Sequence, residues 1–295
     1  MLTQTIRDHF PEAEIDFLVR DRFASIVEQC EAVDKLIIFN RKGGPLGFWK
    51  LLKEIRKKDY DAVLDVQAQF RTGLMIAAAK SKKKIGRADA REGSGVFCNH
   101  IINLPEKSEP HQVDLFLQFL PALGKPAELG TPVPFKTPPI ESIEPRFEKH
   151  PPILLLPHSR GKEKEWPFFR ELTHKLLEEL PEAHVVWDSH IPIPSEELDS
   201  NDRFFNTTGK TSIPEMMSLV KHACLVVAND TGPMHIAAAL AKPTIALFGP
   251  TKIETYGAYP LDHPRNLNLQ ADSGKMEDLS VQEVFDAIQV RLIEH

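Results

Sequence analysis

The stretch "ANDTGPMHIAAALAKPTIALFGPT", residues 228–251, places groups that can bind an anion between two apolar runs. Pro233 suits the first turn of a helix, where its missing N–H costs nothing, and Thr231 can cap that helix. Gly232 lets the backbone approach a ligand closely. The positive end of the helix dipole would lie behind this turn, and His235 could add a donor. We therefore predict that the turn holds a phosphate or diphosphate.

Asp230 stands apart from this set, because a carboxylate beside a phosphate would repel it. We expect it to accept hydrogen bonds from sugar hydroxyls or from backbone N–H groups of its own loop. The next apolar run ends in the turn Gly249, Pro250 and Thr251, which we expect on the same rim. Two neighbouring strand ends would then frame one pocket.

A second loop with anion-binding character follows the apolar run at 153–156. It reads "PHSRGKEKEWP", and its basic and hydroxyl side chains are His158, Ser159, Arg160, Lys162 and Lys164. Such groups favour phosphate or carboxylate ligands. The alternative interpretation is a solvated basic loop.

Short β-prone runs alternate with helical ones along the chain, which predicts parallel sheets covered by helices on both faces. The expected strands are 14–19, 35–39, 61–66, 153–156, 184–187, 224–228 and 242–248, and the expected helices include 2–9, 46–58, 72–80 and 212–222. Such sheets bind ligands beyond the carboxyl ends of their strands. A proline-dense bridge at 124–152 predicts two domains, 1–148 and 149–295, with the last helix packing back on the first.

In the first half, "LDVQAQFRTG" places Asp65, Gln67 and Arg71 at a predicted strand end, as candidates for polar contacts to a substrate. The alternative is that Asp65 caps a turn and Arg71 is a solvated cation. The basic run "KSKKKIGR" at 80–87 is typical of a solvated helix end, and the alternative is a face toward an anionic substrate or membrane headgroups.

The composition is that of a soluble globular protein: 42% hydrophobic, 26% charged, net charge −6 and pI near 6.1 over 295 residues. This balance offers no whole-chain attraction to nucleic acid. Cys30, Cys98 and Cys224 are far apart and form no CxxC pair, so we expect no disulfide framework and no zinc site. No acidic metal-binding cluster stands out in the sequence, and we expect no metal ion and no cofactor. Without a leader or a membrane-spanning run, we expect a cytoplasmic protein. The oligomeric state stays open.

Taken together, "NDTGPMHIAAALAKPTIALFGPT" and "SRGKEKEWP" resemble the lipopolysaccharide heptosyltransferases, glycosyltransferase family 9. The stretches "YDAVLDVQAQFRTG", "HQVDLFLQFLPALG" and "TGKTSIPEMMSLVKHACLVV" extend the resemblance over nearly the whole chain. It implies an α/β fold of the GT-B kind, with two facing Rossmann-like domains. It also implies an ADP-heptose donor in the second domain, a lipopolysaccharide inner-core acceptor in the first, and an inverting, metal-independent transfer. Because such acceptors are lipid-linked, we expect peripheral contact with the inner face of the membrane.

The same resemblance implies roles for individual residues. Lys164 matches the donor-contacting lysine of the family and, with Asp230, is expected to be catalytic. The residues that match donor-binding positions are Ser159, Arg160, Lys164, Thr211, Asp230, Thr231, Gly232 and His235. Thr211 falls near the expected adenine position. A ribose-binding acid is expected after 184–187, where Asp188, Glu196 and Glu197 all fit.

The chain departs from the family at its beginning. Family members start with a strand and a glycine–aspartate loop that supplies the general base, whereas this sequence opens inside the following helix. We therefore expect the first domain to lack its usual first strand, and Asp65 and His111 are the nearest candidates to replace the base. The alternative function is a non-catalytic ADP-sugar-binding protein. A nucleotide-sugar epimerase would need acid and histidine pairs facing the sugar, for which the sequence offers little support.

Overall fold

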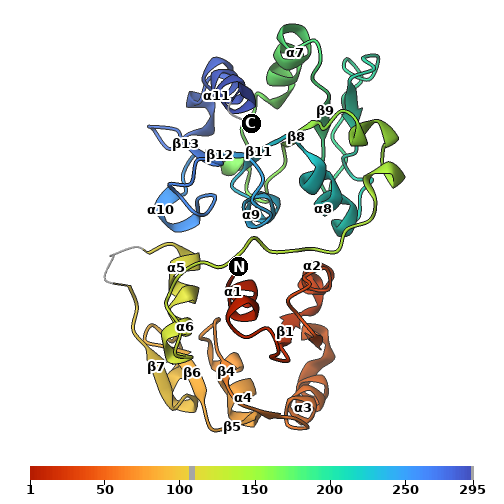
Figure 1. Cartoon of the computed structure of the whole chain (residues 1–295). Helices are drawn as coiled ribbons and strands as arrows, with labels where there is room; N and C mark the ends of the chain where they lie inside the picture. Colours follow the sequence, from red (N-terminus) through yellow and green to blue (C-terminus); the bar gives the residue numbers. More distant parts are fainter. Residues whose placement is uncertain (106–109, 294–295) are drawn as a thin grey trace. The chain divides into compact units, whose positions relative to one another are not determined.

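The computed structural model describes residues 1–105 and 110–293, and the chain divides into two compact units, Met1–Thr131 and Pro132–His295 (Figure 1). The boundary lies earlier than the predicted 148/149. The Thr131 N–H donates to Asp8 in the first unit, whereas the Val133 N–H donates to the Ala239 carbonyl in the second. Residues 132–152 of the expected bridge therefore belong to the second unit, and their buried side chains include Val133, Phe135, Ile140 and Phe147.

The second unit is built on one six-stranded parallel sheet with the order β10-β9-β8-β11-β12-β13. Its strands are β8 (Ile153–Leu156), β9 (Val185–Trp187), β10 (Phe204–Asn206), β11 (Leu225–Asn229), β12 (Thr244–Phe248) and β13 (Asn266–Gln270). In chain order this is third, second, first, fourth, fifth, sixth, the doubly wound arrangement. β8, β11 and β12 are buried at every position, as expected for apolar runs covered on both faces.

Helices cover both faces of this sheet (Figure 1). α7 (Phe169–Glu179) and α11 (Val281–Ile293) lie on one face, and α8 (Ile213–His222) and α9 (Gly232–Ala239) lie on the other. Phe285 and Ile288 of α11 are buried in the same core as Leu172 and Leu176 of α7. The apolar face of α11 thus completes the core of its own unit. A small helix, α10 (Ile253–Tyr256), follows β12.

The strand order fixes where a ligand can bind in this unit. β8 and β11 are neighbours, and the chain leaves them in opposite directions along the sheet, toward β9 and toward β12. Loops that diverge in this way leave a crevice at the carboxyl ends of the two strands. Both predicted anion-binding loops, 157–167 and 230–232, follow these two strands.

The first unit carries smaller sheets. β1 (Asp16–Arg20) pairs in parallel with β2 (Lys35–Phe39), β3 (Asp59–Tyr60) pairs with β5 (Lys80–Ser81), and β4 (Val63–Leu64), β6 (Lys84–Arg87) and β7 (His100–Ile102) form a third sheet. The helices are α1 (Leu2–His9), α2 (Ala24–Val27), α3 (Gly44–Ile55), α4 (Phe70–Ala78), α5 (Gln112–Leu117) and α6 (Phe119–Ala122). The described strands of this unit thus form separate sheets in place of a single one.

Two hydrophobic clusters hold the first unit together. One packs β2 against α3 and α4, with Ile37, Leu51 and Met75 at its centre. The other packs β6 and β7 against α6, around Ile85 and Phe119. No helix among residues 1–105 and 110–293 combines the length and apolar character needed to cross a bilayer.

Candidate functional site

A lysine and an aspartate meet at the crevice between β8 and β11. The Lys164 Nζ lies 2.7 Å from Oδ2 of Asp230, and the Thr251 hydroxyl donates to the same oxygen at 2.8 Å. Asp230 is buried, with 8% exposure, while the Lys164 side chain is 30% exposed. Three loops that follow β8, β11 and β12 therefore converge on one carboxylate.

Glu165 holds the loop after β8 in shape. Its Oε1 accepts the Ser159 N–H at 2.9 Å and lies 2.6 Å from Nδ1 of His158. The buried Ser159 hydroxyl lies 3.5 Å from the Asp230 carbonyl, at the limit of a hydrogen bond. Arg160, the other half of the predicted polar pair, is exposed.

Asn229 ties the same loop to the end of β11. Its Oδ1 accepts the Trp166 N–H at 3.0 Å, and its Nδ2 donates to the Pro157 carbonyl at 2.9 Å. Asn229 is fully buried, so these bonds satisfy an amide that burial would otherwise penalise. Sequence reasoning missed both Asn229 and Glu165. A polar residue that ends an otherwise apolar buried strand was the available signal for Asn229.

The amino end of α9 supports the predicted anion turn with one correction. Thr231 is the N-cap residue but its hydroxyl does not cap the helix, and among the described residues its buried oxygen has no hydrogen-bond partner. Pro233 has no N–H and Met234 is fully buried, so Thr231 and Gly232 are the first-turn positions that a ligand can reach. A Cβ at Gly232 would meet nothing within 4 Å, and His235 is exposed one turn further on.

The three acids predicted as candidates for binding the ribose differ in their burial. Asp188 is buried after β9, and its Oδ1 accepts the hydroxyls of Thr211 at 2.6 Å and Thr207 at 3.0 Å. Burial raises the pKa of the Asp188 carboxyl, and the two hydroxyls oppose that rise. Glu196 and Glu197 are exposed, and Glu197 lies 3.4 Å from the Arg170 guanidinium.

Asp188 and Thr211 belong to the same edge of the sheet as the lysine–aspartate pair. The β8 and β9 ends are adjacent in register, and the rings of His158 and His190, which follow them, lie 4.7 Å apart. The predicted site residues that follow β8, β9 and β11 therefore lie along the same edge of the sheet.

The candidate site residues Asp65 and Gln67 of the first unit form hydrogen bonds with residues close to them in sequence. Asp65 lies at the end of β4, as predicted, but it is buried and accepts the Ala68 N–H at 2.9 Å and the Thr72 hydroxyl at 3.0 Å. Ala68 has a φ of 55°, so Asp65 secures a left-handed turn. Gln67 is exposed and donates to Gln69 at 3.2 Å.

Arg71 and His111 are likewise engaged within their own surroundings. The Arg71 guanidinium lies 5.6 Å from the centre of the Phe39 ring. His111 is buried at the start of α5, where its Nδ1 accepts the Val113 N–H at 3.1 Å. Within the described part of the chain, His, Cys, Asp and Glu side chains form no group of three or more that could ligate a metal ion.

The family model of glycosyltransferase family 9 (heptosyltransferase) matches residues 48–288. The chain belongs to this family. The lipopolysaccharide core heptosyltransferase OpsX of Haemophilus influenzae is 26% identical over 266 residues, covering 84% of this chain and 73% of that protein. Lipopolysaccharide heptosyltransferase 1 of Escherichia coli is 25% identical over 301 residues and covers 91% of both chains.

Solved structures share the fold over almost the whole chain. The glycosyltransferase family 9 protein of Veillonella parvula superposes with a TM-score of 0.82 at 18% identity, covering 99% of this chain and 92% of that one. The E. coli heptosyltransferase WaaC with ADP gives 0.77 at 22% identity, covering 98% and 94%. The predicted GT-B-like α/β fold is therefore confirmed. UDP-GlcNAc 2-epimerase from Methanocaldococcus jannaschii shares that fold more distantly, with a TM-score of 0.54 at 15% identity, covering 99% and 89%.

Proposed function

We propose that this heptosyltransferase moves a heptose from ADP-heptose to the inner core of lipopolysaccharide in the cytoplasm, with inversion and without a metal ion. Family membership and the lipopolysaccharide heptosyltransferases among its relatives support the reaction class. WaaC has been solved with ADP and with ADP-2-deoxy-2-fluoro heptose, which supports the donor. The observation that carries the proposal is the Lys164–Asp230 pair at the crevice between β8 and β11.

Departure of the diphosphate builds negative charge on the leaving group. In our account Lys164 and the amino end of α9 stabilise that charge, since fixed positive groups at such a position lower the barrier without reorganisation. The open space beside Gly232 allows the diphosphate to approach the backbone closely. Ser159, Arg160, Thr231 and His235 are proposed as further contacts to the donor.

Asp230 is compatible with an anionic ligand in this arrangement. Its Oδ2 is bonded by Lys164 and Thr251, so much of its negative charge is balanced before the donor arrives. We propose that Asp230 positions the Lys164 ammonium and accepts hydrogen bonds from hydroxyls of the transferred sugar. Asp188 and Thr211 would border the nucleoside at the neighbouring strand end, since β8 and β9 are paired.

The acceptor hydroxyl requires a general base within hydrogen-bond reach. Asp65 accepts two local hydrogen bonds and the His111 Nδ1 accepts one, so we assign that role to neither residue. Gln67 and Arg71 remain proposed contacts to the acceptor at the end of β4.

The test is transfer from ADP-heptose to a heptose-free lipopolysaccharide core, followed by mass spectrometry and NMR of the product. We expect the acceptor to gain one heptose with inverted anomeric configuration, and EDTA to leave the rate unchanged. Binding of ADP-heptose without transfer to any core acceptor would contradict the proposal and favour the ADP-sugar-binding alternative. A rate that EDTA abolishes and Mg²⁺ restores would contradict its metal-independent part.

A further inference from the structure

The region around α3 differs in charge from the rest of the molecule. Residues 41–58 hold seven Lys or Arg and one acidic residue, Glu54, for a net charge of +6, whereas the whole chain carries −6. Nothing in the proposed transfer uses this segment. Its charge therefore needs an explanation of its own.

α3 is apolar on two faces. Leu51 and Ile55 are buried against Ile37 and Met75 in the core of the first unit. On the opposite side Leu46 is 75% exposed and Trp49 is 59% exposed. A monomeric soluble protein gains nothing from holding these two side chains in water, so a contiguous exposed pair of this kind points to a partner.

The exposed apolar pair lies within a basic stripe. Lys50 and Lys53 are exposed and follow Leu46 at spacings of four and seven residues, which places them along one helix face. The Lys53 ammonium lies 5.6 Å from the centre of the Trp49 ring. Arg56, the C-cap residue of α3, is exposed as well.

Most of this positive charge is not balanced by carboxylates. Glu54 is shared by Lys35 and Lys57, and Lys58 pairs with Glu14 and Asp16. Within residues 1–105 and 110–293, the structure gives no ion pair to the remaining cations of the segment, which are Arg41, Lys42, Lys50, Lys53 and Arg56. These five groups are free to meet an external anionic surface.

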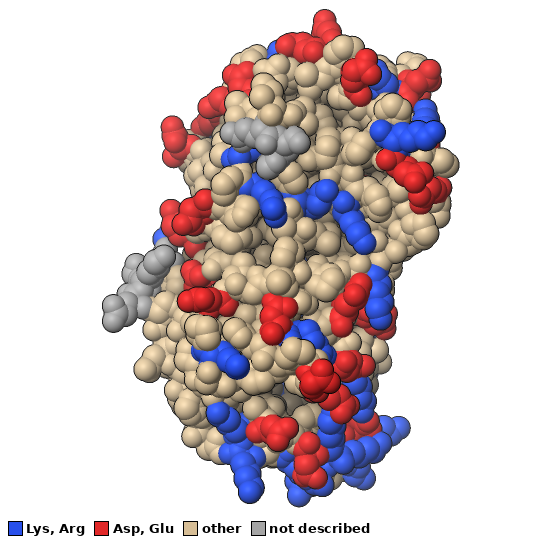
Figure 2. Space-filling model, viewed as in Figure 1, with Lys and Arg blue, Asp and Glu red and all other residues tan. Residues whose placement is uncertain are grey.

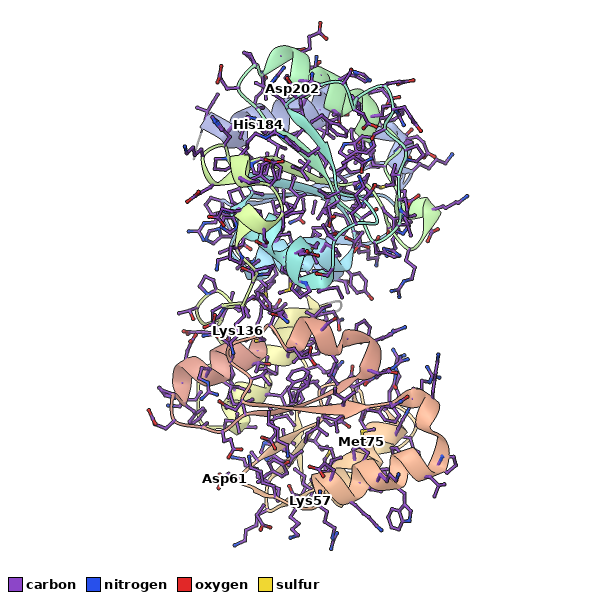
Figure 3. All side chains as sticks on the ribbon, turned by 90° about the vertical axis from the view of Figure 1, so that its right-hand side faces the viewer. Lys57, Asp61, Met75, Lys136, His184 and Asp202 are labelled. Atoms are coloured by element: carbon purple, nitrogen blue, oxygen red, sulfur yellow. The ribbon has the colours of Figure 1, made fainter. Side chains whose placement is uncertain are left out.

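The lysine-rich run at 80–87 extends the same end of the unit. β5 pairs with β3 directly after α3, with Lys80 beside Asp59, so the lysines at 80–84 lie next to the end of the basic segment. Asp59 and Asp61 reduce the net charge here without reversing it. Figure 2 shows Lys and Arg side chains projecting from the end of this unit where Figure 1 draws α3 and β5, and Figure 3 shows Lys57 and Asp61 at that end.

We propose that Leu46 and Trp49, together with Arg41, Lys42, Lys50, Lys53 and Arg56, form a docking face for a membrane rich in anionic lipids. Tryptophan and leucine enter the headgroup region, and lysine and arginine keep their charges at the phosphates while their stems cover apolar surface. A nucleic acid would use the charges and could stack a base on Trp49, but it would leave Leu46 in water. The combination of the two kinds of side chain selects the lipid surface.

Trp49 offers a direct probe of this contact. The other two tryptophans, Trp166 and Trp187, are each 2% exposed, so a change in emission on adding vesicles reports Trp49. We expect a blue shift with phosphatidylglycerol–phosphatidylcholine vesicles and none with pure phosphatidylcholine. Trp49→Phe should abolish the shift. The measurement contains no ADP-heptose and no core acceptor, so its outcome is independent of the proposed transfer.

Co-sedimentation with the same vesicles then tests the individual groups. Each lysine near an anionic surface contributes about a fivefold factor in binding, so Lys50→Glu with Lys53→Glu should lower the partition coefficient by roughly 25-fold or more. Leu46→Ser should weaken binding while leaving the preference for anionic lipid. The matched controls are Lys136→Glu with Lys221→Glu, two exposed lysines of the second unit, and Val290→Ser, which is 54% exposed. They should bind like the unaltered chain.

Three outcomes would overturn the proposal. One is equal binding to pure phosphatidylcholine, and another is unchanged binding of the Lys50 and Lys53 double variant. The third is concentration-dependent dimerisation without vesicles that Leu46→Ser abolishes, since this face would then join two copies of the chain.

Discussion

Two strand ends in this protein each carry an aspartate, but the hydrogen-bond partners of the two carboxylates come from different parts of the chain. After β4, the Asp65 carboxylate bonds Ala68 and Thr72, three and seven residues away, and secures its own turn. After β11, the Asp230 carboxylate bonds Lys164 and Thr251, which are 66 and 21 residues distant and follow two other strands. We therefore propose a ligand site at Asp230, where partners from neighbouring strands converge. Local partners indicate a turn.

Lys164→Ala should produce the largest effect, because we propose that Lys164 stabilises the negative charge that develops on the leaving diphosphate. We expect the transfer rate to fall by roughly 10²–10³-fold, as for loss of one preorganised charge-stabilising group. The free energy of unfolding should also fall, because the buried Asp230 carboxylate loses the ammonium that balances it and keeps only the Thr251 hydroxyl. Lys162→Ala, an exposed lysine of the same short turn, is the control. Equal losses of rate in Lys164→Ala and Lys162→Ala would contradict a specific role for Lys164 in stabilising the leaving group.

Gly232→Val tests the proposed diphosphate position, because the new side chain would fill the open space next to the Gly232 backbone. Because a Cβ there meets no atom within 4 Å, the variant should fold with a Tm lowered by no more than about 2 °C. ADP at 100 times its Kd should stabilise the unaltered chain by about 2.7 kcal/mol, and the variant should lose this stabilisation. Gly47→Val in α3, where a Cβ also meets nothing, should keep it. A persistent ADP shift in Gly232→Val would place the diphosphate elsewhere.

Asp65→Ala tests the other side of the comparison. Removing a buried acceptor leaves the Ala68 N–H unpaired, so the free energy of unfolding should fall by about 1–3 kcal/mol. The ADP-induced rise in Tm should stay as it is in the unaltered chain. Denaturant unfolding and thermal shift measure the two quantities. Loss of ADP stabilisation in this variant would mean that the first-unit strand end shapes the donor site.

The smallest effect concerns pH. Burial raises the pKa of Asp188 above its ordinary value of 3.8, so the folded protein holds this proton more tightly than the unfolded chain. The stability that Asp188 contributes is therefore present at low pH and is lost as pH rises from about 3.8 through the raised value. The unfolding free energy of the unaltered chain, relative to Asp188→Asn, should fall across that window. A difference that rises with pH would show that the hydroxyl bonds of Thr207 and Thr211 outweigh burial.

Sequence patterns predicted the features that depend on continuous apolar runs. β8 was expected at 153–156 and β11 at 224–228, and the structure places them at Ile153–Leu156 and Leu225–Asn229. Lys164 and Asp230 follow the carboxyl ends of these two strands, which lie at the same edge of the sheet, but their ion pair was not predicted. The roles of Glu165 and Asn229 were missed, since each acts through a backbone partner that only the folded loop brings near.

The domain boundary shows the opposite case. Residues 124–152 contain many prolines and no periodicity, which favours a linker, yet Ile140 and Phe147 are almost fully buried. Phe147 stacks edge-on against Phe205 of β10 at 4.9 Å, so irregular backbone still carries core side chains. The short edge strand β10 gave no periodic signal either, because its pairing with β9 and not its own three residues defines it.

The most direct test of the central claim compares the binding of ADP and AMP to the unaltered chain and to Lys164→Ala by isothermal titration calorimetry. If the pair at the crevice between β8 and β11 grips the diphosphate, the variant should bind ADP about as weakly as the unaltered chain binds AMP, while its affinity for AMP changes little. An unchanged affinity for ADP would contradict the account, as would an equal loss of affinity for both nucleotides.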